Sequence, residues 1–318
     1  MILVCGEALV DLFIKARGEG GLNAEAVVGG SPFNVAVGLA RLGCPAAFCG
    51  AIARDPLGEE LVATLVRNGV EVAHVRRSDR PTTLSLATAT RDGSVHYRFY
   101  GEQAADRDLP AEALPDCSGF AAIAVGSYSL GVEPVGSTIE TLLAREGARR
   151  VVSIDPNLRP DLIGDMASWR QRFARLVTHA TVVKASAEDI ATAYGEKADA
   201  GAMAAAWLAA GVKLVAVTRG EKGASAYLAD GTVLDVPARP IRLIDAVGAG
   251  DTFHAALLAF LAGRGKLDRQ AIATIDHETV TEALHYAASA ASITCSRRGA
   301  DLPSRQEVEA ILHERTMV

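Results

Sequence analysis

Apolar runs alternate along this chain with segments in which apolar residues recur at helical spacing. The runs predict strands over Ile2 to Ile14, Ala46 to Ala53, Phe120 to Gly126, Arg150 to Asp155, Thr181 to Lys184 and Lys213 to Thr218. The helical spacing predicts helices over Asn34 to Leu42, Leu57 to Asn68, Pro134 to Glu146, Ala200 to Ala210, Thr252 to Leu261, Val280 to Thr294 and Arg305 to His313. Several strands are apolar throughout, as is typical of parallel strands buried on both faces. The alternation predicts an α/β fold with a doubly wound, mainly parallel sheet.

Two hairpins interrupt this alternation. Period-two patterning on both sides of Asp92-Gly93, from Leu84 to Tyr100, predicts one hairpin, and Asp230-Gly231 predicts another. With residues 11–28, the first hairpin, within residues 82–106, is expected to form a small sheet that stands off the main one. The pattern alone leaves two interpretations open: a lid over a site, or an antiparallel edge of the main sheet. Residues 1–318 are otherwise expected to form a single domain.

Composition narrows the functional classes. The formal net charge of -6 argues against binding to nucleic acid, and an anionic ligand would need a local positive site. No apolar run approaches the roughly 20 residues that span a bilayer, and acidic residues interrupt the apolar N-terminus, so we expect a cytoplasmic protein without a membrane partner. The five cysteines show no CxxC spacing, which favours free thiols over a metal site or disulfides.

The segment "VGAGDT", which begins at Val247, contains the clearest candidate for chemistry. It precedes a helical pattern, and the amides of a helix N-terminus bind anions. Asp251 could simply cap that helix, but a cap needs one glycine at most, whereas Gly248, Ala249 and Gly250 clear several successive amides. A carboxylate in a phosphate cradle indicates phosphoryl transfer to an alcohol, with the carboxylate accepting the hydroxyl proton.

A second glycine pair lies near the N-terminus, in "VVGGSPFN". Gly29 and Gly30 would let a ligand lie against the backbone, and Asn34 offers a donor and an acceptor to a polyol. Asp11 interrupts an apolar strand and adds an acceptor. Taken alone, this stretch is equally well explained as a turn that leads into a capped helix.

Together these motifs resemble those of the ribokinase-like (PfkB) carbohydrate kinases. "GGSPFNVAVGLARLG", "DPNLRP", "TRGEKGA", "DAVGAGDTF" and "ITCSRRGADLP" occur in the family's order and spacing, so the resemblance covers essentially the whole chain. Within the family the chain is most similar to bacterial fructokinases, through "GGSPFN", "RFYGEQAADR" and the segment from Lys184 to Ser186.

The resemblance implies a three-layer α/β/α core with a small β-sheet lid, and in many members of the family that lid also makes a homodimer contact. It implies that Asp251 is the catalytic base and that Gly248, Ala249 and Gly250 form the anion hole. For the sugar it implies Asp11, Gly29, Gly30 and Asn34, with Phe99 on the lid. For ATP it implies Ser186, Thr218, Gly220, Gly223, Ala288 and Ser292.

Three charged positions allow two interpretations each. Lys184 could direct its charge to the nucleotide phosphates or extend into solvent from a strand end. Arg159, at a strand end, is expected to contact phosphate or nucleotide rather than form a structural salt bridge. Arg98 is either a substrate contact on the lid or an exposed hairpin arginine.

The metal sites depart from the family pattern or are incomplete. Many members carry an N-x-x-E motif that organises Mg²⁺ through water, whereas this chain has Ser186, Ala187, Glu188 and Asp189. We still expect Mg²⁺, because ATP phosphates need charge neutralisation, with Asp189 acting indirectly. Asp245 and Val247 match a monovalent-cation loop, which implies K⁺.

The expected activity is ATP-dependent phosphorylation of a primary hydroxyl, with fructose giving fructose 6-phosphate. A kinase for 2-keto-3-deoxygluconate is the alternative within the family, and Arg98 could then pair with the carboxylate. A sensor without catalysis is disfavoured because Asp251 and the glycines are present. A Rossmann dehydrogenase and a P-loop kinase are excluded, since neither G-x-G-x-x-G after the first strand nor G-x-x-x-x-G-K-[ST] occurs.

Overall fold

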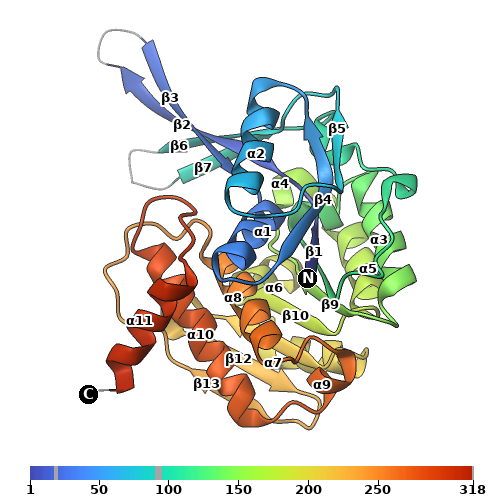
Figure 1. Cartoon of the computed structure of the whole chain (residues 1–318), viewed down its shortest axis with the longest axis vertical. Coiled ribbons are helices and arrows are strands. Elements are labelled where there is room, and N and C mark those ends of the chain that lie inside the picture. Colours follow the sequence, from blue (N-terminus) through green and yellow to red (C-terminus); the bar gives the residue numbers. More distant parts are fainter. Residues whose placement is uncertain (18–20, 90–94, 317–318) are drawn as a thin grey trace.

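A mainly parallel sheet of nine strands forms the centre of the computed structural model, which describes residues 1–17, 21–89 and 95–316 (Figure 1). Neighbouring strands from β5 to β11 are parallel, β12 is antiparallel to β11, and β13 is antiparallel to β12. The spatial order is β13 (Val233–Val236), β12 (Ala224–Leu228), β11 (Leu214–Thr218), β10 (Val182–Ser186), β9 (Val151–Asp155), β8 (Ala122–Gly126), β1 (Ile2–Cys5), β4 (Ala46–Ala53) and β5 (Val75–Ser78). The predicted architecture is confirmed, and so is the hairpin at Asp230-Gly231, which joins β12 to β13.

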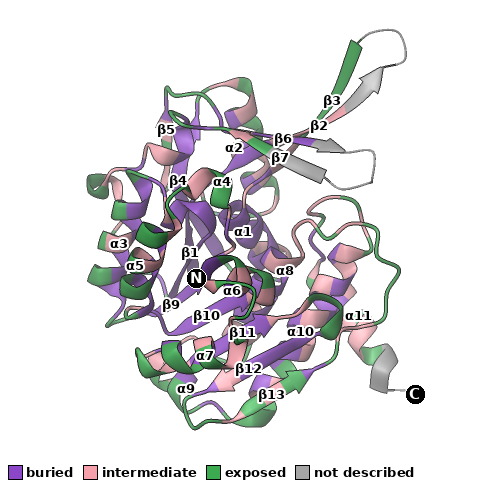
Figure 2. Cartoon of the chain, turned by 180° about the vertical axis from the view of Figure 1, so that it is seen from behind, coloured by how far each residue is buried: buried purple, intermediate pink, exposed green. Residues whose placement is uncertain are grey.

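Helices cover both faces of this sheet (Figures 1 and 2). One face carries α1 (Ser31–Arg41), α2 (Pro56–Arg67), α8 (Ala249–Gly263), α9 (Arg269–Ala273), α10 (His277–Cys295) and α11 (Arg305–Thr316). The other carries α3 (Val135–Glu146), α5 (Met166–Val177), α6 (Ala187–Tyr194) and α7 (Ala200–Ala209). Successive strand residues alternate between the two cores: Leu214 belongs to the first and Val215 to the second. Shorter helical turns are α4 (Pro160–Ile163), η1 (Ala105–Arg107), η2 (Ala111–Ala113), η3 (Ser127–Leu130) and η4 (Gly220–Lys222).

A separate sheet of four strands stands off the main one (Figure 1). Its order is β3 (Gly21–Gly29), β2 (Leu9–Arg17), β6 (Leu84–Ala89) and β7 (Val95–Tyr100), with β2 and β6 parallel and the outer pairs antiparallel. We call these four strands the lid. The interpretation as an edge of the main sheet is therefore wrong, while the turn at Asp92-Gly93 lies outside the described residues.

The prediction of one strand from Ile2 to Ile14 is wrong. The chain leaves the main sheet after Cys5 and enters the lid at Leu9. Gly6 makes this break with φ of 152°, and a Cβ there would lie 2.4 Å from Pro32 Cγ. Only glycine fits so close an approach in that conformation. Helices α5, α6 and α9 and the short α4 are absent from the predicted elements, although α5 buries Trp169 and Phe173 at a spacing of four residues.

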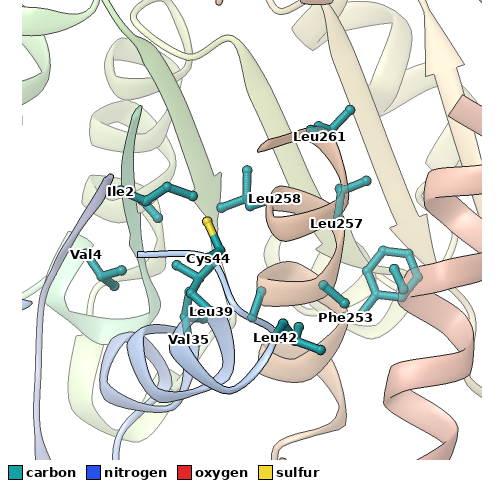
Figure 3. Close-up of a cluster of buried hydrophobic side chains, with 14 of the residues drawn as sticks. Ile2, Val4, Val35, Leu39, Leu42, Cys44, Phe253, Leu257, Leu258 and Leu261 are labelled. Atoms are coloured by element: carbon teal, nitrogen blue, oxygen red, sulfur yellow. The ribbon is translucent and has the colours of Figure 1, made fainter. Parts of the chain in front are cut away.

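Helices α1 and α8 pack directly against each other, and this contact orders the site (Figure 3). Val35 and Leu39 of α1 share a buried cluster with Phe253 and Leu257 of α8. Gly38 allows the close approach, since a Cβ on it would lie 2.9 Å from that of Ala255. The first turns of the two helices therefore meet at the same end of the sheet.

Candidate active site

A cavity of about 790 Å³ opens at the carboxyl ends of the central strands. Its lining comes from the residues that follow β1, β8, β9, β10 and β11, from the first turns of α1 and α8, and from the lid. Ligands of open α/β sheets bind at this edge, where successive strands lead to opposite sides of the sheet. In this structure that point lies beside β1, because the chain continues from β1 to β4 on one side and later to β8 on the other.

Asp251 lies in the first turn of α8 and is 5% exposed at the wall of this cavity. Its carboxylate accepts hydrogen bonds from Ser31 Oγ at 2.6 Å and Asn34 Nδ2 at 2.8 Å, both from α1. Asn157 Nδ2, which follows β9, donates at 3.2 Å. The residue that caps α8 is Gly248, without a side-chain bond, so Asp251 is not a helix cap. Three polar side chains hold its carboxylate in place at the cavity.

The turn before Asp251 exposes the amides of the α8 N-terminus. Gly248 is left-handed, with φ of 77°, and a Cβ there would lie 2.6 Å from that of Ala300. A Cβ on Gly250 would come within 3.0 Å of Lys184 Nζ, so the lysine ammonium lies directly beside this turn. Both glycines line the cavity, whereas Ala249 is outside the lining found among the described residues. Helix amides and an ammonium thus converge on one point of the cavity wall.

Lys184 is buried, which excludes the interpretation as a solvent-reaching lysine. Its Nζ donates to Asp155 Oδ2 at 2.7 Å, and the side chains are 3% and 1% exposed. Burial raises the pKa of Asp155 to about 7 against the opposing effect of Lys184. Burial acts to lower the pKa of Lys184, but the carboxylates of Asp155, Asp189 and Asp251 outweigh it and raise that pKa. The pair places a positive charge behind the anion-binding turn.

His254, one turn along α8, forms part of the polar layer beneath the cavity. Its Nε2 lies 2.7 Å from Ser153 Oγ. Burial, together with the charge of Lys184, lowers its pKa to about 3. The ring is therefore neutral at physiological pH, and Lys184 is the cation at this position.

The lid closes the other end of the cavity. Asp11, Phe99 and Gly30 line it, as the sequence predicts for a sugar-binding region. Burial raises the pKa of Asp11, and Arg159 opposes that effect. The Arg159 guanidinium itself donates to Asn157 Oδ1 and Leu158 O, both at 2.8 Å, which fixes it at the cavity near Asp11. Arg159 therefore lies at the lid end of the cavity.

Two predicted contacts lie elsewhere. Arg98 is exposed on β7 and pairs with Leu86, whereas its neighbour Phe99 pairs with Ser85. Adjacent strand residues face opposite sides, so Arg98 points away from the cavity that Phe99 lines, and the exposed alternative holds. Gly29 is buried against Asp11: a Cβ on it would lie 2.9 Å from Asp11 Oδ2. Its role is to allow that carboxylate to lie close to the backbone.

A polar wall beside β1 and β8 was not among the predicted site residues. Glu7 and Tyr128 line the cavity and are nearly inaccessible to solvent. Ser129 Oγ donates to Glu7, and Tyr128 donates to Asp106 Oδ2 at 2.9 Å. Burial raises the pKa of Glu7 to about 7, despite the hydrogen bonds that favour its charged form. Ser127, with φ of 60°, holds this turn in a conformation that is rare outside glycine.

The segment that replaces N-x-x-E forms a capping box at the start of α6. Ser186 Oγ accepts from the Asp189 amide, and Asp189 Oδ2 accepts from the Ser186 amide. Asp189 Oδ1 accepts from the Leu158 amide at 2.8 Å. Both carboxylate oxygens are thus engaged, which fits an indirect role towards a metal better than direct coordination. Glu188 is exposed and lines the same part of the cavity.

The predicted nucleotide contacts divide into two groups. Thr218, the last residue of β11, and Gly220, just after that strand, line the cavity. Gly223 instead packs against the end of β13, where a Cβ would lie 2.0 Å from Val236 O. Ala288 and Ser292 belong to α10 and are not part of this lining as far as the structure describes it, and Ser292 Oγ donates to Ser289 O at 2.7 Å.

The loop before α8 is organised by Asp245. Its carboxylate accepts from the Val247 amide at 3.0 Å and from the Gly299 amide at 2.9 Å. Asp245 and Val247 both line the cavity. Across the described part of the chain, no group of three or more His, Cys, Asp or Glu side chains has the arrangement of a metal site.

The remaining expectations concern thiols and membranes. All five cysteines are free, as predicted. Among the helices of the described residues, none is long and apolar enough to cross a bilayer.

The residues that sequence reasoning missed are Ser31, Asn157 and Asp155, besides the wall that contains Glu7. All three lie inside motifs that were recognised, "GGSPFN" and "DPNLRP". Their position in the sequence could have identified them, because polar residues at a helix start or at the end of a buried strand gather at the ligand-binding edge of the sheet.

Comparison with known proteins agrees with this geometry. A model of the pfkB family carbohydrate kinases matches residues 1–307. A fructokinase of Rhizobium leguminosarum bv. trifolii is 40% identical over 281 residues, which are 88% of this chain and 85% of the relative. The crystal structure of a Xylella fastidiosa fructokinase with bound ATP superposes with a TM-score of 0.91 at 27% identity and covers 99% of this chain and 98% of that one. A double mutant of the fructokinase from Vibrio cholerae O395, bound to fructose, ADP and a potassium ion, gives a TM-score of 0.84 at 26% identity, with 98% and 97% covered.

Proposed function

This chain belongs to the pfkB family of carbohydrate kinases, and on that premise we propose that it is an ATP-dependent fructokinase that forms fructose 6-phosphate. The observation that carries the proposal is the Asp251 carboxylate, held by Ser31 and Asn34 beside the amides of α8 and the Lys184 ammonium. A base next to an anion-binding turn is the arrangement that phosphoryl transfer to an alcohol requires. The fructokinase relatives support fructose as the acceptor.

In the proposed mechanism, Asp251 accepts the proton of the sugar's primary hydroxyl as that oxygen bonds to the γ-phosphorus of ATP. The bond from this phosphorus to the bridging oxygen breaks, and ADP leaves. The amide of Gly250 and the Lys184 ammonium stabilise the charge on the transferring phosphoryl oxygens, whereas the Ala249 amide donates to Ala246 O and is not available to them. Asp11, Gly30 and Phe99 hold the sugar at the lid end, while Thr218 and Gly220 contact the nucleotide.

Magnesium and potassium are part of the proposal. Glu188 at the cavity edge and Asp189 in the capping box would face a Mg²⁺ ion, which supplies neutralising charge to the ATP phosphates. Asp245 and Val247 are proposed for K⁺, supported by the potassium-bound Vibrio cholerae relative.

We also propose a homodimer formed through the lid. The outer strand β3 is exposed over most of its length, and its Leu22 is 72% exposed. An exposed strand edge with apolar side chains favours pairing with another chain. Leu22→Lys is expected to shift the protein to monomer in sedimentation velocity, and an unchanged sedimentation coefficient would contradict a lid contact.

The test of function is ADP release from magnesium ATP with fructose, 2-keto-3-deoxygluconate, ribose, tagatose, glucose and adenosine as acceptors. Asp251→Asn should fold, bind ATP and lose about 10² to 10⁴ in kcat. The matched control is Asp276→Asn, the same change at the cap of α10, which should keep full activity because asparagine caps helices equally well. Near-normal turnover by Asp251→Asn would refute the mechanism, and preference for another sugar would refute fructose.

A further inference from the structure

Ser85 on the lid strand β6 has a hydroxyl without a partner. The residue is 0% exposed, and its Oγ has no hydrogen-bond partner among the described residues. The two hydroxyls before it on the chain are both bonded: Thr82 Oγ1 donates to Asp55 at 2.7 Å, and Thr83 Oγ1 donates to Asp106. A buried hydroxyl without a partner costs free energy, and in native proteins it calls for a partner or a function.

The position of Ser85 identifies where that partner would come from. Ser85 lines the cavity, and strand register places it directly between Asp11 of β2 and Phe99 of β7. These three residues form one row across the lid, on the face that the cavity touches. The Ser85 hydroxyl is near enough to oppose the effect of burial on the Asp11 pKa, but it lies outside hydrogen-bond geometry with that carboxylate.

The row combines three complementary groups. Asp11 offers acceptors, Ser85 offers one donor and one acceptor, and Phe99 offers an apolar ring. A polyol presents hydroxyls on its edges and C–H groups on its faces, so it can satisfy all three groups at once. Resting on the proposed function, we infer that Ser85 binds a hydroxyl of the acceptor sugar and makes the site reject acceptors that lack this hydroxyl.

The physical basis for rejection is the unpaired group. When a site is built to bond a substrate hydroxyl, an analogue without it leaves a buried polar group unsatisfied, and discrimination is strong. Removing the serine hydroxyl should therefore weaken the binding of the natural acceptor but have little effect on the binding of an acceptor that already lacks the matching hydroxyl.

The experiment compares wild type with Ser85→Ala on fructose and on its single-deoxy analogues. For fructose, Ser85→Ala should raise KM about tenfold, the loss expected for one hydrogen bond, and leave the KM for ATP unchanged. With one deoxy analogue the two proteins should have the same KM. The thermal midpoint of Ser85→Ala should change little, because the hydroxyl forms no hydrogen bond of normal geometry with the described residues.

Ser225→Ala is the matched control. Ser225 is also a buried strand serine, 1% exposed, but its Oγ donates to Asp235 at 2.5 Å on the far edge of the main sheet. That variant should lose stability and keep the KM for fructose. The pattern for Ser85 should be the reverse.

Two results would overturn the inference. The first is an unchanged KM for fructose in Ser85→Ala. The second is an equal rise in KM for fructose and for every deoxy analogue, which would mean that Ser85 acts only through Asp11 or packing. Failure of the proposed function appears separately, in the wild type. If the wild type prefers another sugar, the same comparison on that sugar and its deoxy analogues decides the role of Ser85. Calorimetric binding of the sugar decides it if turnover is absent.

Discussion

Glu7→Gln should change how the stability of this protein depends on pH. Glu7 is 1% exposed, and burial raises its pKa from an ordinary 4.5 to about 7. Between these values the folded protein holds a proton that the unfolded chain releases. The free energy of unfolding therefore falls as pH rises, and this contribution is complete below pH 4.5 and lost above about pH 7.

The magnitude follows from the shift. A difference of about 2.5 pKa units corresponds to about 3 kcal/mol, lost at about 1.4 kcal/mol per pH unit. Glutamine keeps the size of the side chain and does not ionise. Relative to wild type, Glu7→Gln should gain about 3 kcal/mol of stability between pH 4.5 and pH 8.

Urea unfolding of both proteins at half-unit pH steps from 4.5 to 8 measures this difference. Ser129→Ala provides a second arm: Ser129 donates to Glu7 and opposes the pKa shift, so removing it should move the pH dependence to higher pH. Stability curves that run parallel for wild type and Glu7→Gln at every pH would refute the reasoning.

Three other predictions concern the anion site, the helix contact and the cation loop. Lys184→Met should lower kcat by about 10² to 10³ in steady-state kinetics. In urea unfolding at pH 8 it should lower the free energy of unfolding by about 3–5 kcal/mol, because Asp155 is left unpaired. A normal kcat would exclude Lys184 from the phosphoryl site. Gly38→Val should lower the free energy of unfolding by about 1–3 kcal/mol and also lower kcat, because even a Cβ at this position would lie 2.6 Å from Leu302 Cδ2. An unchanged urea midpoint together with an unchanged kcat would contradict the close packing of α1. Asp245→Asn should abolish a rate increase in KCl over NaCl, and a retained increase would place the cation elsewhere.

The sequence was most informative where one motif contains both the geometry and the chemistry. Gly248, Gly250 and Asp251 lie within four residues of one another in the sequence and in one turn of the structure, so their local pattern predicts the turn, the helix start and the carboxylate together. Two of the four lid strands, β6 and β7, follow from period-two patterning for a similar reason, since the register within a hairpin depends on residues close to its turn.

Contacts between distant segments could not be predicted in this way. Whether Lys184 reaches solvent depends on Asp155, which lies 29 residues earlier on the neighbouring strand. Asn34 was expected to bind sugar, and it does line the cavity, but the bond from its amide nitrogen to Asp251, 217 residues away, could not be foreseen. The position of Arg98 could not be predicted for a different reason. Strand alternation implies that only one of two adjacent residues faces the cavity, but which of the two does so depends on the fold of the lid, and there it is Phe99.

An acidic protein that is proposed to bind ATP must keep its own carboxylates from repelling the phosphates, and the structure shows how this is possible. Lys184 pairs with Asp155, and Asp251 accepts two hydrogen bonds from α1. Burial favours the neutral form of Glu7 up to about pH 7. The phosphoryl group would therefore meet the amides of α8 and an ammonium at the point where its charge develops, although the net charge of the chain is -6. If ATP affinity depends on this local pairing more than on net charge, breaking the Lys184 pair should weaken ATP binding far more than neutralising a surface lysine does.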